Sequence, residues 1–230
     1  MKMNRLLLFA ACSVLMVSCA EEQETFEGVE GDHAYVDLGL PSGLKWATCN
    51  IGASAPEDYG DYFAWGETSG YQSGKTNFTW NNCKYCNSST ITKYCTDSRY
   101  GDNGFADYKN TLDLTDDAAH ANWGGSWRTP TQTECQELID NCISTWTTVY
   151  GVSGRLFKSK KNGKTLFLPA AGLRIGVDFD SGDSPEGLYW TSSLCSDVPC
   201  SAWFLYSRRG SDGVFNQYRY IGISVRAVCP

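Results

Sequence analysis

The stretch Thr131-Gln-Thr-Glu-Cys-Gln-Glu-Leu-Ile-Asp-Asn-Cys142 carries the clearest helix signal in the chain. Thr131 and Glu134 have the spacing of a capping box, in which each side chain accepts a hydrogen bond from a backbone N–H group at the start of a helix. The apolar side chains recur at helical spacing: Cys135, Leu138, Ile139 and Cys142. We therefore predict an amphipathic helix that buries this stripe. Along such a helix Cys135 and Cys142 are about 10 Å apart, too far for a disulfide bond.

Short segments with the composition of strands lie on both sides of this helix. Before it, residues 35–40 and 44–48 flank a Pro-Ser-Gly turn and predict a hairpin, and residues 62–65 predict a short buried strand. After it, two segments flank a Lys-Asn-Gly turn and four more follow: 155–158, 165–168, 188–192, 202–206, 214–220 and 223–228. A helix followed by successive antiparallel strands is the pattern of an α+β domain. We predict an α+β fold of short antiparallel strands with one or two helices.

Residues 66–108 form a long loop region rich in Asn, Ser, Thr and cysteine. A loop of this length inside a compact domain is uncommon, and it is expected either to be held by disulfide bonds or to have a functional role. Asp116 and Asp117 follow it and place two carboxylates at the start of a short helix, where they would cap its positive end.

The N-terminal residues have the anatomy of a signal peptide, with basic Lys2 and Arg5, an apolar run, and a small residue before Cys19. The run is too short to span a bilayer. Val-Ser-Cys19 resembles a lipobox, whose cysteine becomes lipidated, and ordinary secretion is the alternative. The acidic stretch 21–24 resembles the export signal of Bacteroides-type lipoproteins displayed on the outer membrane. We expect a signal peptide over 1–18, a lipidated acidic tether over 19–30 and one domain over 31–230, held to the membrane by lipid alone.

The charge of the mature chain argues against nucleic acid as a partner. Removing residues 1–18 takes away two basic residues and no acidic one, so the net charge moves from −7 to −9. Binding to a phosphate backbone needs Lys and Arg clustered on one face. We therefore expect no nucleic-acid partner.

Nine cysteines remain after the signal peptide and Cys19 are set aside, and an odd number leaves at least one thiol unpaired. An exported protein favours oxidised cysteines. Cys195 and Cys200 flank a turn-like insert, and Cys49 with Cys229 could join the first and last strands. The remaining loop cysteines, Cys83, Cys86 and Cys95, have a spacing that suits zinc or thiol exchange, although local disulfide stapling is favoured because no second Cys-x-x-Cys motif is present.

Several blocks in order carry a resemblance to a known family: Leu-Pro-Ser-Gly-Leu-Lys-Trp-Ala-Thr-Cys49, Tyr59-Gly-Asp-Tyr-Phe-Ala-Trp-Gly-Glu67, Trp127-Arg-Thr-Pro-Thr131, Tyr189-Trp-Thr-Ser-Ser193 and Ser224-Val-Arg-Ala-Val-Cys-Pro230. They resemble the Fibrobacter succinogenes major paralogous domain, over nearly the whole mature chain. The resemblance implies a C-type-lectin-like fold, with long loops and paired chain ends. A Cys49–Cys229 bond would agree with it.

The Trp-Arg-Thr-Pro-Thr block is also similar to the formylglycine-generating and sulfatase-modifying enzymes. That similarity makes an enzyme one alternative, with Cys195 and Cys200 as the candidate reactive pair. The sequence around them does not match the active site of those enzymes. The two histidines, His33 and His120, supply no set of nucleophile, base and orienting group. We expect no catalytic residues.

The calcium-binding signature of classical lectins is missing from the chain. The most oxygen-rich loop contains Asp178, Asp180 and Asp183, whose carboxylates could surround a hard cation. The same residues also suit an ordinary solvated turn. No cofactor is expected, with calcium at these three residues as the open alternative.

The C-terminal segment concentrates aromatic and cationic side chains, the composition of binding hot spots. The predicted ligand-binding residues are Trp203, Tyr206, Arg208, Arg209, Phe215, Asn216, Tyr218, Arg219 and Tyr220. The Val-Arg-Ala-Val228 ending resembles that of lectin-like proteins whose final segment binds ligands. We expect a non-catalytic surface module for glycan or protein ligands. A structural envelope lipoprotein without a soluble ligand is the first alternative, and an enzyme the second.

Overall fold

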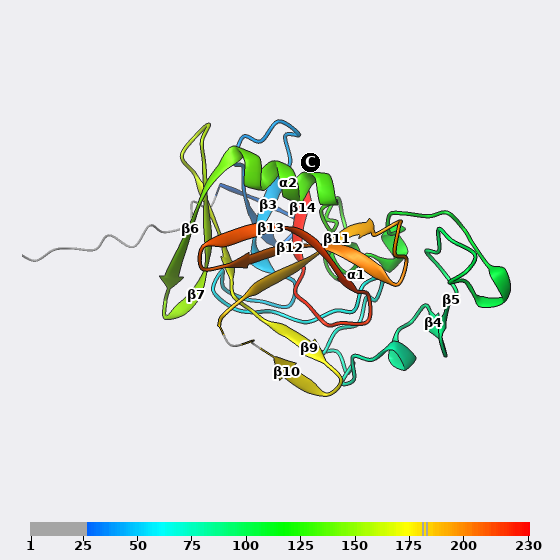
Figure 1. Ribbon diagram of the computed structural model, residues 1–230. Coiled ribbons are helices and arrows are strands. Elements are labelled where there is room, and N and C mark those ends of the chain that lie inside the picture. The colour runs from blue at the N-terminus through cyan, green and yellow to red at the C-terminus, as the bar shows by residue number, and fades with distance from the viewer. Residues whose placement is uncertain (1–26, 181, 183) are drawn as a thin grey trace, which may run out of the picture.

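The computed structural model describes residues 27–180, 182 and 184–230 (Figure 1). Antiparallel strands dominate it and two α-helices accompany them, which confirms the α+β class. Cys19, most of the predicted tether and Asp183 lie outside the described residues. No helix of the described residues is both long and apolar enough to cross a membrane.

The helices are α1 (Ala118–Trp123), α2 (Gln132–Asn141) and three short 3₁₀ helices, η1 (Trp80–Asn82), η2 (Asp102–Gly104) and η3 (Leu114–Asp116). The strands are β1 (Gly28–Glu30), β2 (His33–Val36), β3 (Lys45–Asn50), β4 (Cys86–Asn87), β5 (Thr90–Ile91), β6 (Cys142–Val149), β7 (Val152–Ser159), β8 (Thr165–Pro169), β9 (Leu173–Ile175), β10 (Asp178–Asp180), β11 (Gly187–Leu194), β12 (Ser201–Arg208), β13 (Ser211–Tyr218) and β14 (Arg226–Cys229).

The two ends of the domain meet in one sheet of order β1-β2-β3-β14. The predicted hairpin is confirmed by the antiparallel pairing of β2 with β3, and β14 adds to β3 on its other side. The sheet begins earlier than predicted, because β1 pairs with β2 and the Glu30 carbonyl accepts a hydrogen bond from Trp127 Nε1 at 2.9 Å. The boundary at Gly31 is therefore wrong, since the folded domain already includes β1.

Helix α2 confirms the capping box. The Glu134 N–H donates to Thr131 Oγ1 at 3.3 Å, and the Thr131 N–H donates to Glu134 Oε2 at 2.7 Å. Cys135 and Leu138 are buried as predicted. The helix ends at Asn141, however, so Cys142 belongs to β6 and not to the helix. The run after Asn141 is rich in Ile, Thr, Trp and Val, which favour strands.

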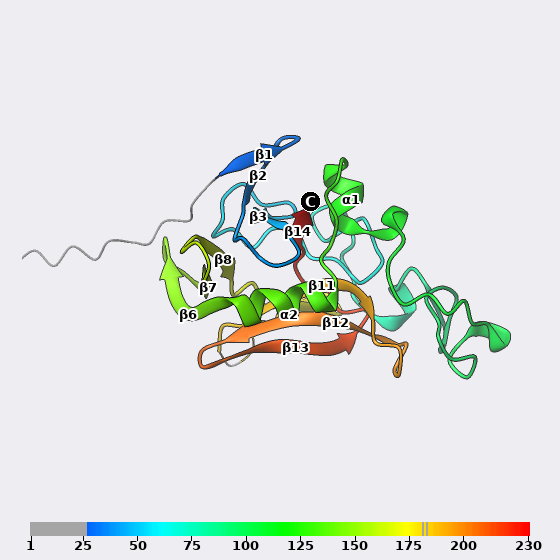
Figure 2. The same ribbon diagram turned by 90° about the horizontal axis from the view of Figure 1, so that it is seen from above.

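Helix α2 packs on the three-stranded sheet β11-β12-β13, as Figure 2 shows from above. A second three-stranded sheet, β6-β7-β8, contains the predicted hairpin around the Lys-Asn-Gly turn. One apolar cluster lies beside α2 and includes Trp46, Leu138 and Leu205. A second cluster contains Trp65, Trp127 and Trp190, and a small third cluster lies around Phe78. The core is thus divided into three clusters.

Residues 62–65 are buried as predicted, but they do not form a strand. Phe63 makes a single bridge, exchanging two backbone hydrogen bonds with Ile223 at 3.0 and 3.1 Å. Trp65 N–H then donates to the carbonyl of Arg219 at 2.8 Å. Long-range packing, and not a continuous ladder, holds this segment.

The loop from residue 66 to residue 117 includes β4 and β5, which project at one end of the molecule (Figure 1). Its C-terminal end contains two buried carboxylates with different tasks. Asp117 caps α1, as predicted, by accepting from the N–H groups of Ala119 and His120. Asp116 does not cap the helix and instead accepts hydrogen bonds from lysine and tyrosine side chains of the loop.

Candidate ligand-binding surface

The predicted ligand-binding residues do not form one face. Trp203 lies opposite Asn216 in the β12–β13 ladder, and opposite residues share a face of a sheet while successive residues alternate. Tyr206 and Phe215 therefore lie on the other face. Helix α2 packs against the face of Trp203 and Asn216, because Leu205, which shares that face, belongs to the same apolar cluster as α2 side chains.

Three aromatic residues form what we call the tyrosine patch: Trp80, Tyr218 and Tyr220. The rings of Tyr218 and Tyr220 are stacked, with centroids 5.6 Å apart and an interplanar angle of 11°. Trp80 meets Tyr220 edge to face at 6.3 Å. Tyr218 is 50% exposed, whereas Trp80 and Tyr220 are half-buried. Sequence reasoning missed Trp80, because it comes from the long loop and no local pattern places it beside the C-terminal segment.

A second aromatic group contains Tyr206, Arg208 and Phe215. The rings of Tyr206 and Phe215 meet edge to face at 5.8 Å, and the Arg208 guanidinium lies 6.0 Å from the Tyr206 ring. The Tyr206 hydroxyl donates to Glu186 Oε1 at 2.5 Å. Burial, followed by this hydrogen bond, raises the pKa of Tyr206 to about 12. The Tyr206 hydroxyl therefore already has a hydrogen-bond partner within the protein.

Arg208 and Arg209 lie at the tip of the β12–β13 hairpin, where both are exposed. Gly210, with a φ of +85°, completes this tight turn. Strand β13 runs from Ser211 at the tip to Tyr218, a separation of about 23 Å at the rise of a β-strand. The two arginines and the tyrosine patch therefore stand at opposite ends of β13.

Arg219 is wrongly assigned to the ligand face. Its side chain is 0% exposed, and its guanidinium donates to the carbonyls of Lys93, Tyr94 and Pro199 at 3.1 to 3.3 Å. It also lies 5.0 Å from the ring of Trp65. Arg219 follows the last residue of β13, and its side chain points inward. Its hydrogen bonds connect the C-terminal segment to the long loop.

The candidate calcium residues lie at the β9–β10 hairpin and beyond it. Asp178 and Asp180 belong to β10 and are exposed. Asp180 Oδ1 accepts a hydrogen bond from the Gly182 N–H at 2.7 Å, which is ordinary turn chemistry. Asp183 lies outside the described residues. Within the described part of the chain, no group of three or more His, Cys, Asp or Glu side chains is arranged to hold a metal ion.

The disulfide bonds expected from the sequence are not formed. Free thiols are present at eight positions: Cys83, Cys86, Cys95, Cys135, Cys142, Cys195, Cys200 and Cys229. The turn does bring the ends of β11 and β12 together, because the Cys195 N–H donates to the Ser201 carbonyl at 3.1 Å. Burial raises the pKa of the Cys195 thiol, which disfavours its reactive thiolate.

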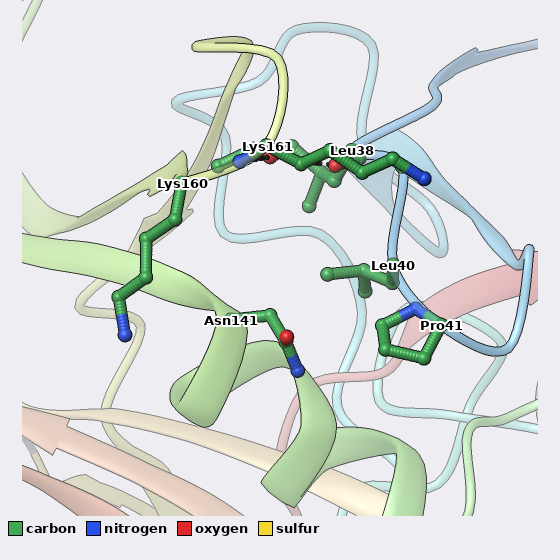
Figure 3. Close-up of a pocket in the computed structure, with 8 residues that line it drawn as sticks. Leu38, Leu40, Pro41, Asn141, Lys160 and Lys161 are labelled. Atoms are coloured by element: carbon green, nitrogen blue, oxygen red, sulfur yellow. Dashed lines mark hydrogen bonds between the residues drawn. The ribbon is translucent and has the colours of Figure 1, made fainter.

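A hollow of about 280 Å³ lies between the loop at Leu38 to Pro41, the end of α2 and the β7–β8 turn (Figure 3). Lys160 and Lys161 line it, but their side chains leave the turn in different directions. The Lys160 ammonium group donates to the carbonyl of Asp140 at 2.6 Å. The two ammonium groups therefore do not converge on one anion, and none of the predicted ligand-binding residues lines this hollow.

No protein-family model, curated protein or solved structure matches this chain.

Proposed function

We propose that this protein is a non-catalytic binding module with a C-type-lectin-like fold, displayed on the cell surface by a lipid anchor. The tyrosine patch is its ligand-binding site, for a glycan or for a protein. The observation that carries this proposal is the arrangement of Trp80, Tyr218 and Tyr220, in which two segments far apart in sequence present an ordered and partly exposed aromatic surface.

The pairing of both ends of the domain in one sheet supports the lectin-like assignment, because the resemblance to the Fibrobacter domain implies that feature. The irregular loop of residues 66–117 is a second supporting feature. The α+β class alone is common to many folds, so the order of the motif blocks and the paired ends have to be considered together.

Aromatic side chains suit a recognition surface for a physical reason. Tyr has a large rigid ring, two side-chain torsions and a hydroxyl that can donate or accept, so it provides contact area at little cost in conformational entropy. Stacking between Tyr218 and Tyr220 restricts the two rings further before any ligand binds. This preorganisation favours affinity.

Replacing Tyr218 and Tyr220 together by serine should weaken ligand binding at least about tenfold, as expected for two hot-spot aromatics. The matched control is Phe215→Ser, because Phe215 is 50% exposed like Tyr218 but belongs to the other aromatic group. The first measurement is a glycan array in calcium, probed with a soluble protein that starts at residue 20 and so keeps β1. Equal affinity of the double variant and the wild type for an array ligand would reject the patch.

The β9–β10 hairpin favours an assembly role as a second candidate function. Ile175, Val177 and Phe179 expose 44%, 67% and 46% of their surface on this hairpin. Contiguous exposed apolar residues are typical of interfaces between proteins. If no glycan on the array binds, sedimentation analysis of the same protein distinguishes the two remaining functions. A stable oligomer favours an assembly role, and a monomer favours a protein ligand.

Replacing Cys19 by alanine should abolish incorporation of a labelled fatty acid, because the lipid would be attached to this sulfur. Labelling of the full chain in a bacterial host, followed by membrane fractionation, tests this result. Cys12→Ala is the matched control and should label like the wild type, since Cys12 belongs to the apolar run of the signal. Persistent labelling of the Cys19→Ala protein would contradict the lipid anchor at this residue.

A further inference from the structure

Strand β6 is the outer strand of the sheet β6-β7-β8 and lies at the edge of the molecule (Figure 1). It has eight residues, Cys142–Val149, and it pairs with β7 over its whole length. In the part of the chain that the structure describes, no backbone hydrogen bond joins β6 to a segment other than β7. One side of β6 is therefore open to a further strand.

The turn between β6 and β7 determines which backbone groups point away from the sheet. Tyr150 and Gly151 form this turn with φ values of 46° and 85°, as in the two-residue turns that favour a β-hairpin. The pair that flanks such a turn, Val149 and Val152, is hydrogen-bonded, and bonded and non-bonded pairs alternate from there. The residues that direct their N–H and C=O groups outward are therefore Ser144, Trp146 and Thr148.

The sequence of β6 does not oppose the addition of a strand. Edge strands of natural proteins are commonly protected by charged side chains, proline, bulges or short length. The sequence Cys-Ile-Ser-Thr-Trp-Thr-Thr-Val of β6 contains no charged residue and no proline, and its register with β7 has no bulge. Its Ile, Thr, Trp and Val residues also favour strands. Strand β6 thus has the properties of a strand that pairs on both sides.

Other outer strands are covered or carry a charge. In β11, the Trp190 N–H donates to the Ser224 carbonyl at 3.0 Å. In β14, Val228 and Arg128 exchange two backbone hydrogen bonds at 2.9 and 3.0 Å. Strand β13 has eight residues like β6, but it contains the charged Asp212. These comparisons distinguish β6 as a long, uncharged and uncovered strand.

We propose that β6 is a dimerisation strand, which pairs antiparallel with β6 of a second copy of this chain. The two sheets then become one continuous sheet across the dimer. A chain with a net charge of −7 repels its own copy, and an uncharged strand is the kind of contact that adds nothing to this repulsion. The proposal goes beyond the ligand-binding function and rests neither on the tyrosine patch nor on the lipid anchor.

The backbone of β6 is complementary to its own copy. A two-fold axis at Trp146 places this residue opposite Trp146 of the second copy, and Ser144 opposite Thr148 of the second copy. All of these residues direct their N–H and C=O groups outward. Each outward group therefore meets an outward group, as an antiparallel ladder requires.

The side chains agree with the same register. The axis at Trp146 places Ile143 opposite Val149 of the second copy, and Thr145 opposite Thr147 of the second copy. Apolar, hydroxyl and aromatic side chains thus each face a residue of their own kind, and such cross-strand pairs stabilise a sheet. Ile143 is 58% exposed in the single chain, so the dimer would cover an apolar side chain that is now in water.

Sedimentation velocity of the soluble protein that starts at residue 20 tests the proposal. A contact made by one strand from each copy is small, so the dimer should dissociate on dilution. The protein is measured over a hundredfold range of concentration in a reducing agent, which prevents disulfide bonds between copies. We expect a monomer at the lowest concentration and a dimer at the highest. A monomer throughout this range would overturn the proposal.

Three variants assign the dimer to β6. Thr148→Pro removes an outward N–H that β7 does not use, and proline is tolerated at such a position of an edge strand. Thr145→Lys brings two lysines close together across the axis, where like charges are unfavourable. Both proteins should stay monomeric. Phe179→Ser, on the exposed β9–β10 hairpin, should dimerise like the wild type. Dimerisation of both β6 variants, or its loss in Phe179→Ser alone, would overturn the proposal.

Hydrogen exchange of single amides, followed by NMR, tests the register without any substitution. The outward N–H groups of Trp146 and Thr148 should exchange at least about tenfold more slowly at the highest protein concentration than at the lowest. The N–H groups of Thr145 and Thr147 point towards β7 and should be protected at both concentrations. Equal exchange of Trp146 and Thr148 at both concentrations, in a protein that does dimerise, would exclude β6 as the contact.

Discussion

Replacing Arg219 by alanine should lower the free energy of unfolding by about 3–5 kcal/mol, the range for disrupting a buried charged network. The guanidinium is fully buried and donates to three carbonyl groups, two of which belong to the long loop. Alanine would leave these carbonyls without a donor and would create a cavity beside the Trp65 ring. Urea unfolding followed by tryptophan fluorescence measures the loss.

Arg209→Ala is the matched control for this substitution. Arg209 is exposed at the hairpin tip, so its removal should change the free energy of unfolding by about 0.5 kcal/mol or less. The loss of stability of the Arg219→Lys protein should fall between those of the two alanine variants. Lysine keeps the positive charge, but it lacks the planar guanidinium whose several N–H groups reach different carbonyls. Equal stability of the Arg219→Ala and Arg209→Ala proteins would contradict the structural role given to Arg219.

Replacing Asp116 by alanine should cost about 3 kcal/mol, because it removes a buried acceptor and leaves the buried Tyr94 hydroxyl and three further side-chain donors without it. One Asp116 oxygen accepts from Lys84 at 2.9 Å and from the Tyr85 hydroxyl. The other accepts from Lys93 at 2.5 Å and from the Tyr94 hydroxyl at 2.7 Å. The carboxylate therefore joins four side chains of the long loop at one buried point. Thermal unfolding and proteolysis of the loop would both report its loss.

The same carboxylate predicts a dependence of stability on pH. Burial alone would raise the pKa of Asp116, but hydrogen bonds from Lys93, Tyr85, Tyr94 and Lys84 outweigh it and hold the pKa well below its usual range. The folded state thus binds this proton less readily than the unfolded state. The stabilisation is complete above the unfolded pKa of about 4 and is lost as the pH falls through the folded value. The Asp116→Asn protein should lack this part of the acid dependence.

Asp113→Asn is the control for Asp116, since Asp113 also binds Lys93 but has 37% of its side chain exposed. A solvated ion pair contributes about 1 kcal/mol or less, so this variant should remain close to the wild type. If Asp113→Asn and Asp116→Asn unfolded alike at neutral pH and in acid, burial of Asp116 would not be the source of the effect.

The elements with local signals were predictable from the sequence. Thr131 and Glu134 are three residues apart, and the hairpin turn residues stand between the strands they join, so each signal and its effect lie within a few residues. Strand β6 is absent from the sequence prediction although its Ile, Thr, Trp and Val residues favour a strand, and the predicted helix extends one residue too far, to Cys142. Phe63 was assigned to a strand, but its bridge partner, Ile223, is distant in the chain.

The candidate site was predictable in composition but not in arrangement. The concentration of Tyr, Trp and Arg near the C-terminus marked β12 and β13 correctly as an aromatic segment. Sequence could not show that Arg219 turns inward, because the carbonyls it binds belong to the loop and to the β11–β12 turn. It could not show that Trp80 joins Tyr218 and Tyr220 either.

The α+β class, the cap of α2, most of the strand segments and the acidic charge follow from the amino-acid sequence alone, because these depend on residue types and short spacings. Tertiary packing decided which aromatic residues share a surface and which arginine is buried. Those properties depend on contacts between segments more than 100 residues apart, whose free energy is gained only when the whole chain has packed.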